Sequence, residues 1–136
     1  MKHMNKLLPL ALIASLGTAA VPAQAEGIST DTELQDIILT TFVIEVARQR
    51  CPDVSIRMAR AQKEFARLAT HTAKMGYTQD EVTAELASPE AQERHTAKAE
   101  DYIRSKGADP ADKAAVCSFA QEEISARTDV GKLLKR

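Results

Sequence analysis

The two cysteines are the residues of this chain best suited to covalent chemistry. Cys51 and Cys117 are the only two in its 136 residues. Their wide separation excludes a Cys-x-x-Cys redox motif, and one pair is too few for a four-cysteine zinc site. In a small domain that reaches an oxidising compartment, two cysteines favour a disulfide over free thiols. We therefore predict a Cys51–Cys117 disulfide, provided that the chain is exported.

The histidines are the next candidates, as metal ligands. Beyond the first few residues the chain has only His71 and His95, and Met58 and Met75 are the side chains that could accompany them around a copper ion. A metal or catalytic site normally gathers three or four ligands. Methionines at helical spacing are usually core residues, and His71 is expected to face solvent. The sequence therefore predicts no metal and no cofactor.

Patterns for nucleophilic or acid–base catalysis are missing from the sequence. There is no Gly-x-Ser-x-Gly elbow and no glycine-rich loop for phosphate. Paired acids occur at Asp80-Glu81, Glu100-Asp101 and Glu122-Glu123, on helix faces expected to be solvated. Carboxylates that cleave glycosides need a cleft and a raised pKa. We predict no catalytic residues and a protein that is not an enzyme.

The first 25 residues have the order of a secretory signal peptide. Lys2 and Lys6 begin it, an apolar run extends from Leu7 to Val21, and Ala23-Gln24-Ala25 ends it as a small-x-small site. The apolar run of about 15 residues is shorter than the roughly 20 that cross a bilayer. We predict cleavage after Ala25, a periplasmic location, and no transmembrane segment in the remaining chain.

The charge balance gives no indication of a nucleic-acid partner. The chain has 18 Lys and Arg against 19 Asp and Glu, a formal net charge of −1. Loss of the leader makes it slightly more negative, because the leader contains two lysines and no acid. The basic residues are interspersed with acids, whereas a surface that binds phosphates needs them concentrated. A protein partner is the remaining expectation.

Residues 26–136 have the pattern of one all-α domain. Apolar residues recur at steps of three and four, and no alternating strand pattern is evident. A loose lead at 26–31 and a basic, leucine-containing tail at 128–136 flank the helices. The expected helices run from about 32 to 50, 54 to 75, a short stretch after Thr78, 89 to 106, and 110 to 127. With such short connections, the prediction is a compact bundle of about five helices closed by the disulfide.

The second expected helix divides most clearly into two faces. Its apolar stripe is expected in the core and consists of Val54, Met58, Ala61, Phe65, Leu68, Ala69, Thr72 and Met75. The other side is basic and, with two leucines of the tail, forms a candidate partner surface: Arg57, Arg60, Lys63, Arg67, Leu133 and Leu134. Such a surface fits an acidic protein or anionic lipid. More often a basic face of this kind is simply solvated, and a tail of this kind docks on its own domain.

The order of these features resembles a domain-of-unknown-function family of small exported proteins from alpha-proteobacteria. The matching motifs are Cys51-Pro52 with Arg57-Met58 and Ala61, Met75-Gly76-Tyr77-Thr78-x-x-Glu81, Tyr102-Ile103-x-x-x-Gly107, Val116-Cys117, Glu123-Ile124 and Gly131-x-Leu133-Leu134. The resemblance implies an all-helical periplasmic protein with one disulfide and supplies no catalytic residues. It also implies a loose association with the proton-pumping NADH dehydrogenase of the inner membrane.

The function expected on these grounds is that of a periplasmic accessory protein that binds another protein. A stress chaperone is the second possibility, because the chain is similar in outline to small helical acid-stress chaperones with one disulfide. Protonation of the carboxylates near pH 2 to 3 would leave a large positive charge that loosens the bundle. Apolar residues such as Ile37, Ile38, Phe42 and Val43 could then bind unfolding clients.

The leader generates the first testable prediction. Because the basic start, apolar run and small-x-small ending match a cleavable signal, N-terminal sequencing of the exported protein is expected to begin at Glu26. An intact chain recovered from the membrane fraction, with Met1 or Lys2 at its start, would contradict this expectation.

Overall fold

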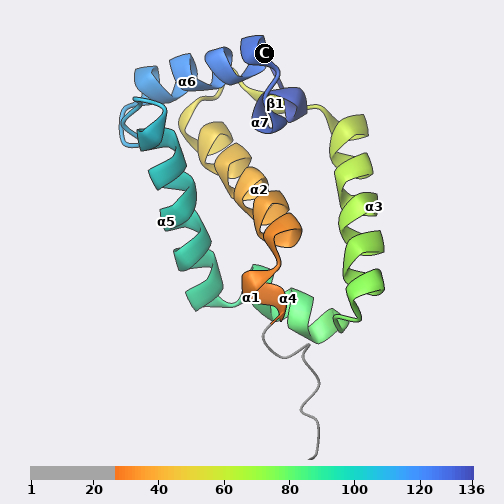
Figure 1. Cartoon of the computed structure of the whole chain (residues 1–136). Helices are drawn as coiled ribbons and strands as arrows, with labels where there is room; N and C mark the ends of the chain where they lie inside the picture. Colours follow the sequence, from red (N-terminus) through yellow and green to blue (C-terminus); the bar gives the residue numbers. More distant parts are fainter. Residues whose placement is uncertain (1–26) are drawn as a thin grey trace, which may run out of the picture.

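The computed structural model describes residues 27–136, so the expected leader lies outside the described part of the chain. Seven helices and two very short strands follow one another in it (Figure 1). They are α1 (Gly27–Thr30), α2 (Thr32–Arg50), β1 (Ser55–Ile56), α3 (Met58–Met75), α4 (Gln79–Ala87), α5 (Pro89–Ser105), α6 (Lys113–Ala126), α7 (Asp129–Leu133) and β2 (Leu134–Lys135). The predicted all-α class is confirmed.

Helix α2 is the centre of the molecule and has the predicted bounds. Asp31 caps its first turn, accepting a hydrogen bond from the Leu34 N–H at 3.0 Å. It buries more residues than any other helix of the described range, on several sides: Leu34, Ile37, Ile38, Val43, Ile44, Val46 and Ala47. In Figure 1 it runs between α5 and α3, and α6 crosses its far end. The remaining elements are therefore arranged around one largely apolar helix.

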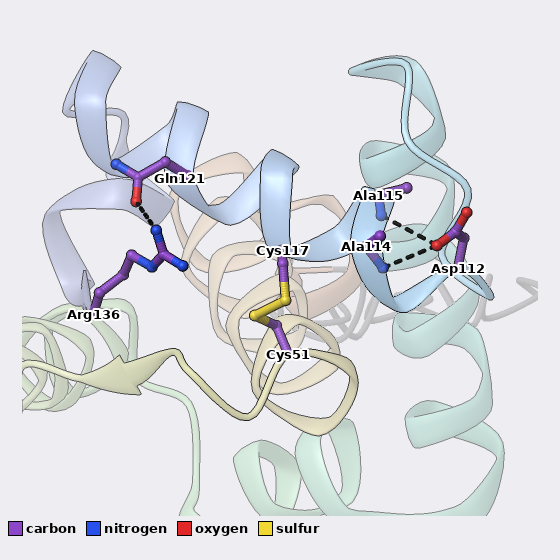
Figure 2. Close-up of a disulfide and its surroundings, with 7 residues drawn as sticks. All are labelled: Cys51, Asp112, Ala114, Ala115, Cys117, Gln121 and Arg136. Carbon is purple, nitrogen blue, oxygen red and sulfur yellow. Dashed lines mark hydrogen bonds between the residues drawn. A yellow bond between two sulfur atoms is a disulfide. The ribbon is translucent and has the colours of Figure 1, made fainter.

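The predicted disulfide ties α2 to α6. Cys51 ends α2 and is almost completely buried, and its sulfur is bonded to that of Cys117 in α6, 66 residues further on (Figure 2). The core around this bond draws on α2, α5, α6, α7 and the connecting segments. It comprises Val43, Ile44, Val46, Ala47, Cys51, Val54, Ala99, Ile103, Ala108, Val116, Phe119, Ala120, Val130 and Leu134. The disulfide thus closes a core built from both halves of the domain.

Several helix boundaries follow the expected signals. Thr78 and Glu81 form a complete capping box at α4, and Ser88 caps α5 with Pro89 in its first turn. Gly76 ends α3 with a left-handed φ of 78°. The expected start of α6 at Asp109-Pro110 is wrong. Those residues form a turn, and Asp112 is the cap that accepts from the Ala114 and Ala115 N–H groups (Figure 2).

The C-terminal tail is not a free extension. Thr128 caps the short helix α7, after which Leu134 and Lys135 pair antiparallel with Ile56 and Ser55. Leu134 is fully buried, and Arg136 reaches Gln121 of α6 (Figure 2). The expected start of the second helix near Val54 is therefore too early, because residues 54–57 are extended to pair with the tail. The segment expected to be a loose lead contains the single helical turn α1.

The buried side chain of Glu123 links the C-terminal segment to α5. Its side chain is buried and accepts hydrogen bonds from the hydroxyls of Tyr102 in α5, at 3.1 Å, and Thr128. Burial and the neighbouring carboxylate raise the pKa of Tyr102 to about 12. The expectation that Glu122-Glu123 lies wholly on a solvated face is thus wrong for Glu123. The carboxylate is tolerated inside because two hydroxyl donors meet it there.

Removal of the disulfide tests how far the core depends on it. In the chain-entropy model, opening a loop of 66 residues lowers the free energy of unfolding by about 4 kcal/mol. The Cys51→Ser/Cys117→Ser double variant is expected to show a markedly lower thermal midpoint by circular dichroism. Reducing agent should lower the midpoint of the natural chain and leave that of the variant unchanged. Equal midpoints for oxidised and reduced protein would contradict the prediction.

Candidate functional site

Helix α3 departs most from the expected packing. Its sequence divides sharply into an apolar and a polar side, yet Thr72 is its only buried residue. Met58, Phe65 and Met75 were expected in the core, but they are 63%, 66% and 41% exposed. The core around the disulfide contains no buried residue of α3. The prediction that the apolar residues of α3 form one stripe is therefore correct. The prediction that this stripe belongs to the core is wrong.

The uncovered side of α3 borders a groove of about 490 Å³, which we name the α2–α3 groove. Its floor is α2, one wall is α3, and α5 contributes the opposite wall. The lining consists of Ile37, Thr41, Phe42, Ile44, Glu45, Val46 and Gln49 of α2, Ile56 of β1, Ala61, Glu64, Phe65 and Leu68 of α3, Gln92 and Thr96 of α5, and Leu133. The lining is mainly apolar, with polar groups at the edges, as in many ligand sites.

The groove stays open because α3 is fixed at both ends. At its start, the Arg57 N–H donates to the Leu133 carbonyl and the Arg57 Nε donates to the Leu134 carbonyl, both at 2.8 Å. The short β1–β2 pairing holds the same end against the tail. At its other end, His71 and Tyr77 reach Asp31 at the start of α2. These attachments set the separation of α3 from α2, so the apolar side of α3 does not close onto its neighbour.

The attachment at the far end is a small polar cluster around Asp31. The Asp31 Oδ2 accepts from the Tyr77 hydroxyl at 3.0 Å and lies 2.7 Å from the His71 Nε2, while the His71 Nδ1 lies 3.3 Å from Glu33. Burial acts to raise the pKa of Asp31, but the hydrogen bonds from Leu34, His71 and Tyr77 outweigh it and hold the pKa below its ordinary value. His71, expected to face solvent, is half-buried in this cluster.

The edges of the α2–α3 groove carry acidic charge. Glu45 and Glu64 are the only ionisable side chains among the described residues that line it. Glu45 contacts Arg48 and Gln49 on its own helix, and Glu64 contacts Arg67, each at 3.0 to 3.4 Å on the exposed surface. Pairs so exposed are weak and exchange readily for others. The edges can therefore accept basic groups from an incoming molecule.

The predicted basic surface is only partly assembled. Arg60, Lys63 and Arg67 are exposed on α3 and line, with Lys132, a second and smaller hollow of about 250 Å³. Arg57 instead anchors the tail, and Leu134 is buried beneath it. Leu133 is half-buried and lines the α2–α3 groove. The tail therefore docks on its own domain.

His95 has a structural position behind the groove. It is 1% exposed, its Nε2 lies 3.0 Å from the Glu85 Oε1, and its ring packs on Phe42 with 5.1 Å between centroids. Burial acts to raise the pKa of Glu85, but hydrogen bonds from Gln35 and Arg94 outweigh it, so that the pKa is lowered overall. This cluster joins α4 and α5 to α2 and positions the Phe42 ring at the groove.

Residues 27–136 contain neither a cluster of metal ligands nor a membrane-spanning helix. In this part of the chain no three His, Cys, Asp or Glu side chains are grouped so that they could hold a metal ion. No helix within the same range is both long and apolar enough to traverse a bilayer.

The chain belongs to a family defined by sequence. The model of the family of unknown function DUF5333 matches residues 26–135. No curated protein matches the chain, and no solved structure matches it. The resemblance inferred from the motifs around Cys51, Gly76, Cys117 and Leu134 is thus confirmed at the level of a family.

The groove residues Ile44, Phe65 and Leu68 were not predicted as a site, and Phe42 was expected to bind other chains only after the bundle loosens in acid. A helical stripe looks the same in the sequence whether it is covered by the chain itself or left open. The available signal was the strict alternation of three- and four-residue steps along α3, from Met58 to Met75. That spacing is typical of helices that pair with another helix.

The cluster around Asp31 generates a pH-dependent prediction. Asp31→Asn is expected to lower the free energy of unfolding by about 1–3 kcal/mol at neutral pH, because buried donors lose a charged acceptor. Since the folded-state pKa is below the ordinary 3.8, the contribution of Asp31 is present above that value and is lost as pH falls through the folded-state pKa.

Denaturant unfolding at several pH values measures this difference. The difference in the free energy of unfolding between the natural chain and Asp31→Asn should be largest at neutral pH. It should decrease as the solution is acidified below the ordinary pKa of 3.8. Asp36→Asn, an exposed acid on the same helix, is the matched control and should change little. A gap that is absent, or that stays constant down to strongly acidic pH, would refute the role given to Asp31.

Proposed function

We propose that this chain is a non-enzymatic accessory protein that binds a helix of another protein in the α2–α3 groove. The observation that carries the proposal is the amphipathic helix α3, whose apolar side is held open along the groove with Phe65 66% exposed. Exposed aromatic side chains beside an apolar cleft are typical anchors of protein interfaces.

The groove favours binding over catalysis. Its lining offers apolar side chains, amides and hydroxyls, and its two carboxylates, Glu45 and Glu64, lie on the exposed edges beside arginines. Neither is buried or paired with a nucleophile, which acid–base or covalent catalysis would need. The lining of the groove is suited to binding another molecule, so we propose that the protein is not an enzyme.

The chemistry of the groove selects a helix as its occupant. Floor and walls are helices, whose backbone groups are already hydrogen-bonded within each helix. An extended segment would find no backbone partners there, whereas an incoming helix brings its own bonds already made. The apolar lining requires an apolar stripe, and the acidic edges at Glu45 and Glu64 favour basic residues on either side of that stripe. The expected occupant is a basic amphipathic helix.

The proposed compartment rests on the predicted signal peptide, and the proposed partner rests on the family resemblance alone. The disulfide is consistent with export to an oxidising compartment, which the predicted signal peptide would provide. The family resemblance implies a place beside an inner-membrane respiratory complex, the NADH dehydrogenase. We propose that the accessory role is exercised there, on the periplasmic side, with a helix of that complex or of a protein bound to it.

A stress chaperone is the second candidate, and the same groove is the reason to keep it. Its open apolar wall could hold a segment of an unfolding client without prior loosening of the domain. The two roles differ in pH dependence. A chaperone of the acid-stress kind should protect clients only at low pH, whereas an accessory protein should bind its helix at neutral pH.

A defined peptide tests the groove. A helical peptide of leucine and lysine about as long as α3, with leucines at helical stripe spacing, should bind the natural chain in fluorescence anisotropy. Phe65→Glu should weaken this binding about tenfold or more, because it places a charge on the apolar wall. Ala66→Glu is the matched control, since it puts the same charge on the adjacent exposed residue outside the groove lining. A leucine–glutamate peptide should bind more weakly than the lysine peptide.

Equal binding to both variants would refute the groove as the site. If the peptide does bind in a Phe65-dependent way, crosslinking and capture from exported fractions are the next step. A comparison of the natural chain with Phe65→Glu would identify a partner whose recovery depends on Phe65. Protection of a client enzyme at low pH alone, lost in Phe65→Glu, would replace the accessory role with the chaperone.

A further inference from the structure

The His71 ring lies between two carboxylates at the start of α2. Its Nε2 is 2.7 Å from the Asp31 Oδ2, and its Nδ1 is 3.3 Å from the Glu33 Oε2. A neutral imidazole carries a single ring proton, so one of its nitrogens would present a lone pair to a carboxylate. Both nitrogens face acids favourably only in the imidazolium, which carries a proton on each. The position of the ring therefore favours its charged form.

We propose that His71 is a proton-dependent latch, which as an imidazolium holds the end of α3 to the start of α2 and releases it when the ring loses its second proton. We name this contact of His71 with Asp31 and Glu33 the His71 latch. The inference does not depend on what binds in the α2–α3 groove. It concerns how firmly one wall of that groove, α3, is held in place.

Asp31 is positioned for the latch by the fold around it. Its Oδ1 accepts the Leu34 N–H as the cap of α2, and its Oδ2 accepts the Tyr77 hydroxyl at 3.0 Å. The Asp31 side chain is 6% exposed and that of His71 is 14% exposed. Charges in such a partly buried place attract each other with less screening than charges in water. The contact with Asp31 is therefore the stronger part of the latch.

Glu33 forms the weaker and more adaptable part. Its side chain is 46% exposed, and its Oε1 lies 3.2 Å from the Arg67 Nε while its Oε2 faces His71. When the ring is neutral, the Glu33 carboxylate can keep Arg67 and turn away from the ring. Loss of the proton thus removes the contact with Glu33 and replaces a hydrogen bond between two charged groups at Asp31 with a weaker one.

The other ionisable groups around His71 lie on three neighbouring segments. Arg67 and Lys74 are one turn to either side of it on α3. Tyr77 follows α3 and is influenced by Glu81 of α4, while α1 has no titratable side chain. Histidine is the side chain among these that changes its charge between about pH 5 and 8. A change of attachment in that range is therefore assigned to His71.

The latch is closed over a window of pH with one edge on each side. At the acid edge Asp31 gains a proton, and its lowered pKa places this edge below the ordinary value of 3.8. At the other edge His71 loses its second proton as the pH rises. The contribution of Asp31 to stability is lost as pH falls, whereas that of the His71 charge is lost as pH rises.

Nitrogen NMR of the imidazole rings tests the charge of His71, with the oxidised protein titrated from about pH 5 to 9. Both nitrogens should carry a proton while the latch is closed. Glu33→Gln should move the midpoint of the titration about half a pH unit lower, because an amide replaces a carboxylate beside the ring. His95, which contacts Glu85 and Phe42, is the internal control and should not respond to this variant.

Hydrogen exchange tests the release of the helix end. The Gly76 and Tyr77 N–H groups donate to backbone carbonyls of the last turn of α3. As His71 loses its proton, their exchange should accelerate about threefold to tenfold beyond its ordinary rise with pH. His71→Gln, which cannot gain the charge, should show the faster exchange at every pH. The Ala61 N–H, bonded in the first turn of α3, is the matched control and should show no such acceleration.

The inference requires that the two measurements share one midpoint. It stands if exchange at Gly76 follows the titration of His71 and if His71→Gln abolishes that dependence. A ring with a single proton throughout, a midpoint unchanged in Glu33→Gln, or exchange that ignores the titration would each overturn it. Glu33 is largely solvent-exposed, so its variant should fold normally, as circular dichroism will show. Peptide binding enters neither measurement, so failure of the latch leaves the proposed function standing.

Discussion

The attachment of α3 at its two ends is the constraint that keeps the α2–α3 groove open. Arg57 is tied to the C-terminal tail through two backbone carbonyls, and His71 and Tyr77 are tied to Asp31. Both attachments are polar, and each joins one end of α3 to a segment that is distant in the sequence. They hold a long helix in place without using its apolar side, which would otherwise collapse against α2. An apolar groove with a fixed width is the result.

Much of the fold could be predicted from local signals in the sequence. The 3.6-residue period of apolar residues predicted both ends of α2 as they are observed. Thr78 and Ser88 cap α4 and α5, because their hydroxyl oxygens accept hydrogen bonds from free backbone N–H groups. The disulfide followed from the count of cysteines and the expected compartment. These predictions succeed because each depends on a few neighbouring residues, or on a pair that can be joined in one way only.

The features that failed prediction depend on contacts between distant segments. The pairing of Ser55–Ile56 with Leu134–Lys135 involves two residues on each strand, too few to leave a pattern. Pro110 resembled a helix start, yet Asp112 supplies the better cap, since its carboxylate meets two free N–H groups. The burial of Glu123 depends on hydroxyls from Tyr102 and Thr128, which only the folded chain brings together. The groove could not be predicted from the sequence for the same reason. Whether an apolar side chain is exposed depends on how the helices pack in the folded chain.

The division between core and groove explains how a small domain can leave aromatic and thioether side chains exposed. The buried core around the disulfide lies outside α3, and Cys51 is joined to Cys117 within it. The stability of the domain therefore does not rest on Phe65, Met58 or Met75, and these residues are free to serve an interface. Exposure of apolar surface carries a cost in solubility, which a bound helix removes. A stable core with a separate, rigidly placed amphipathic helix is thus an arrangement suited to docking, and under the proposed function the acidic edges of the groove would favour basic helices.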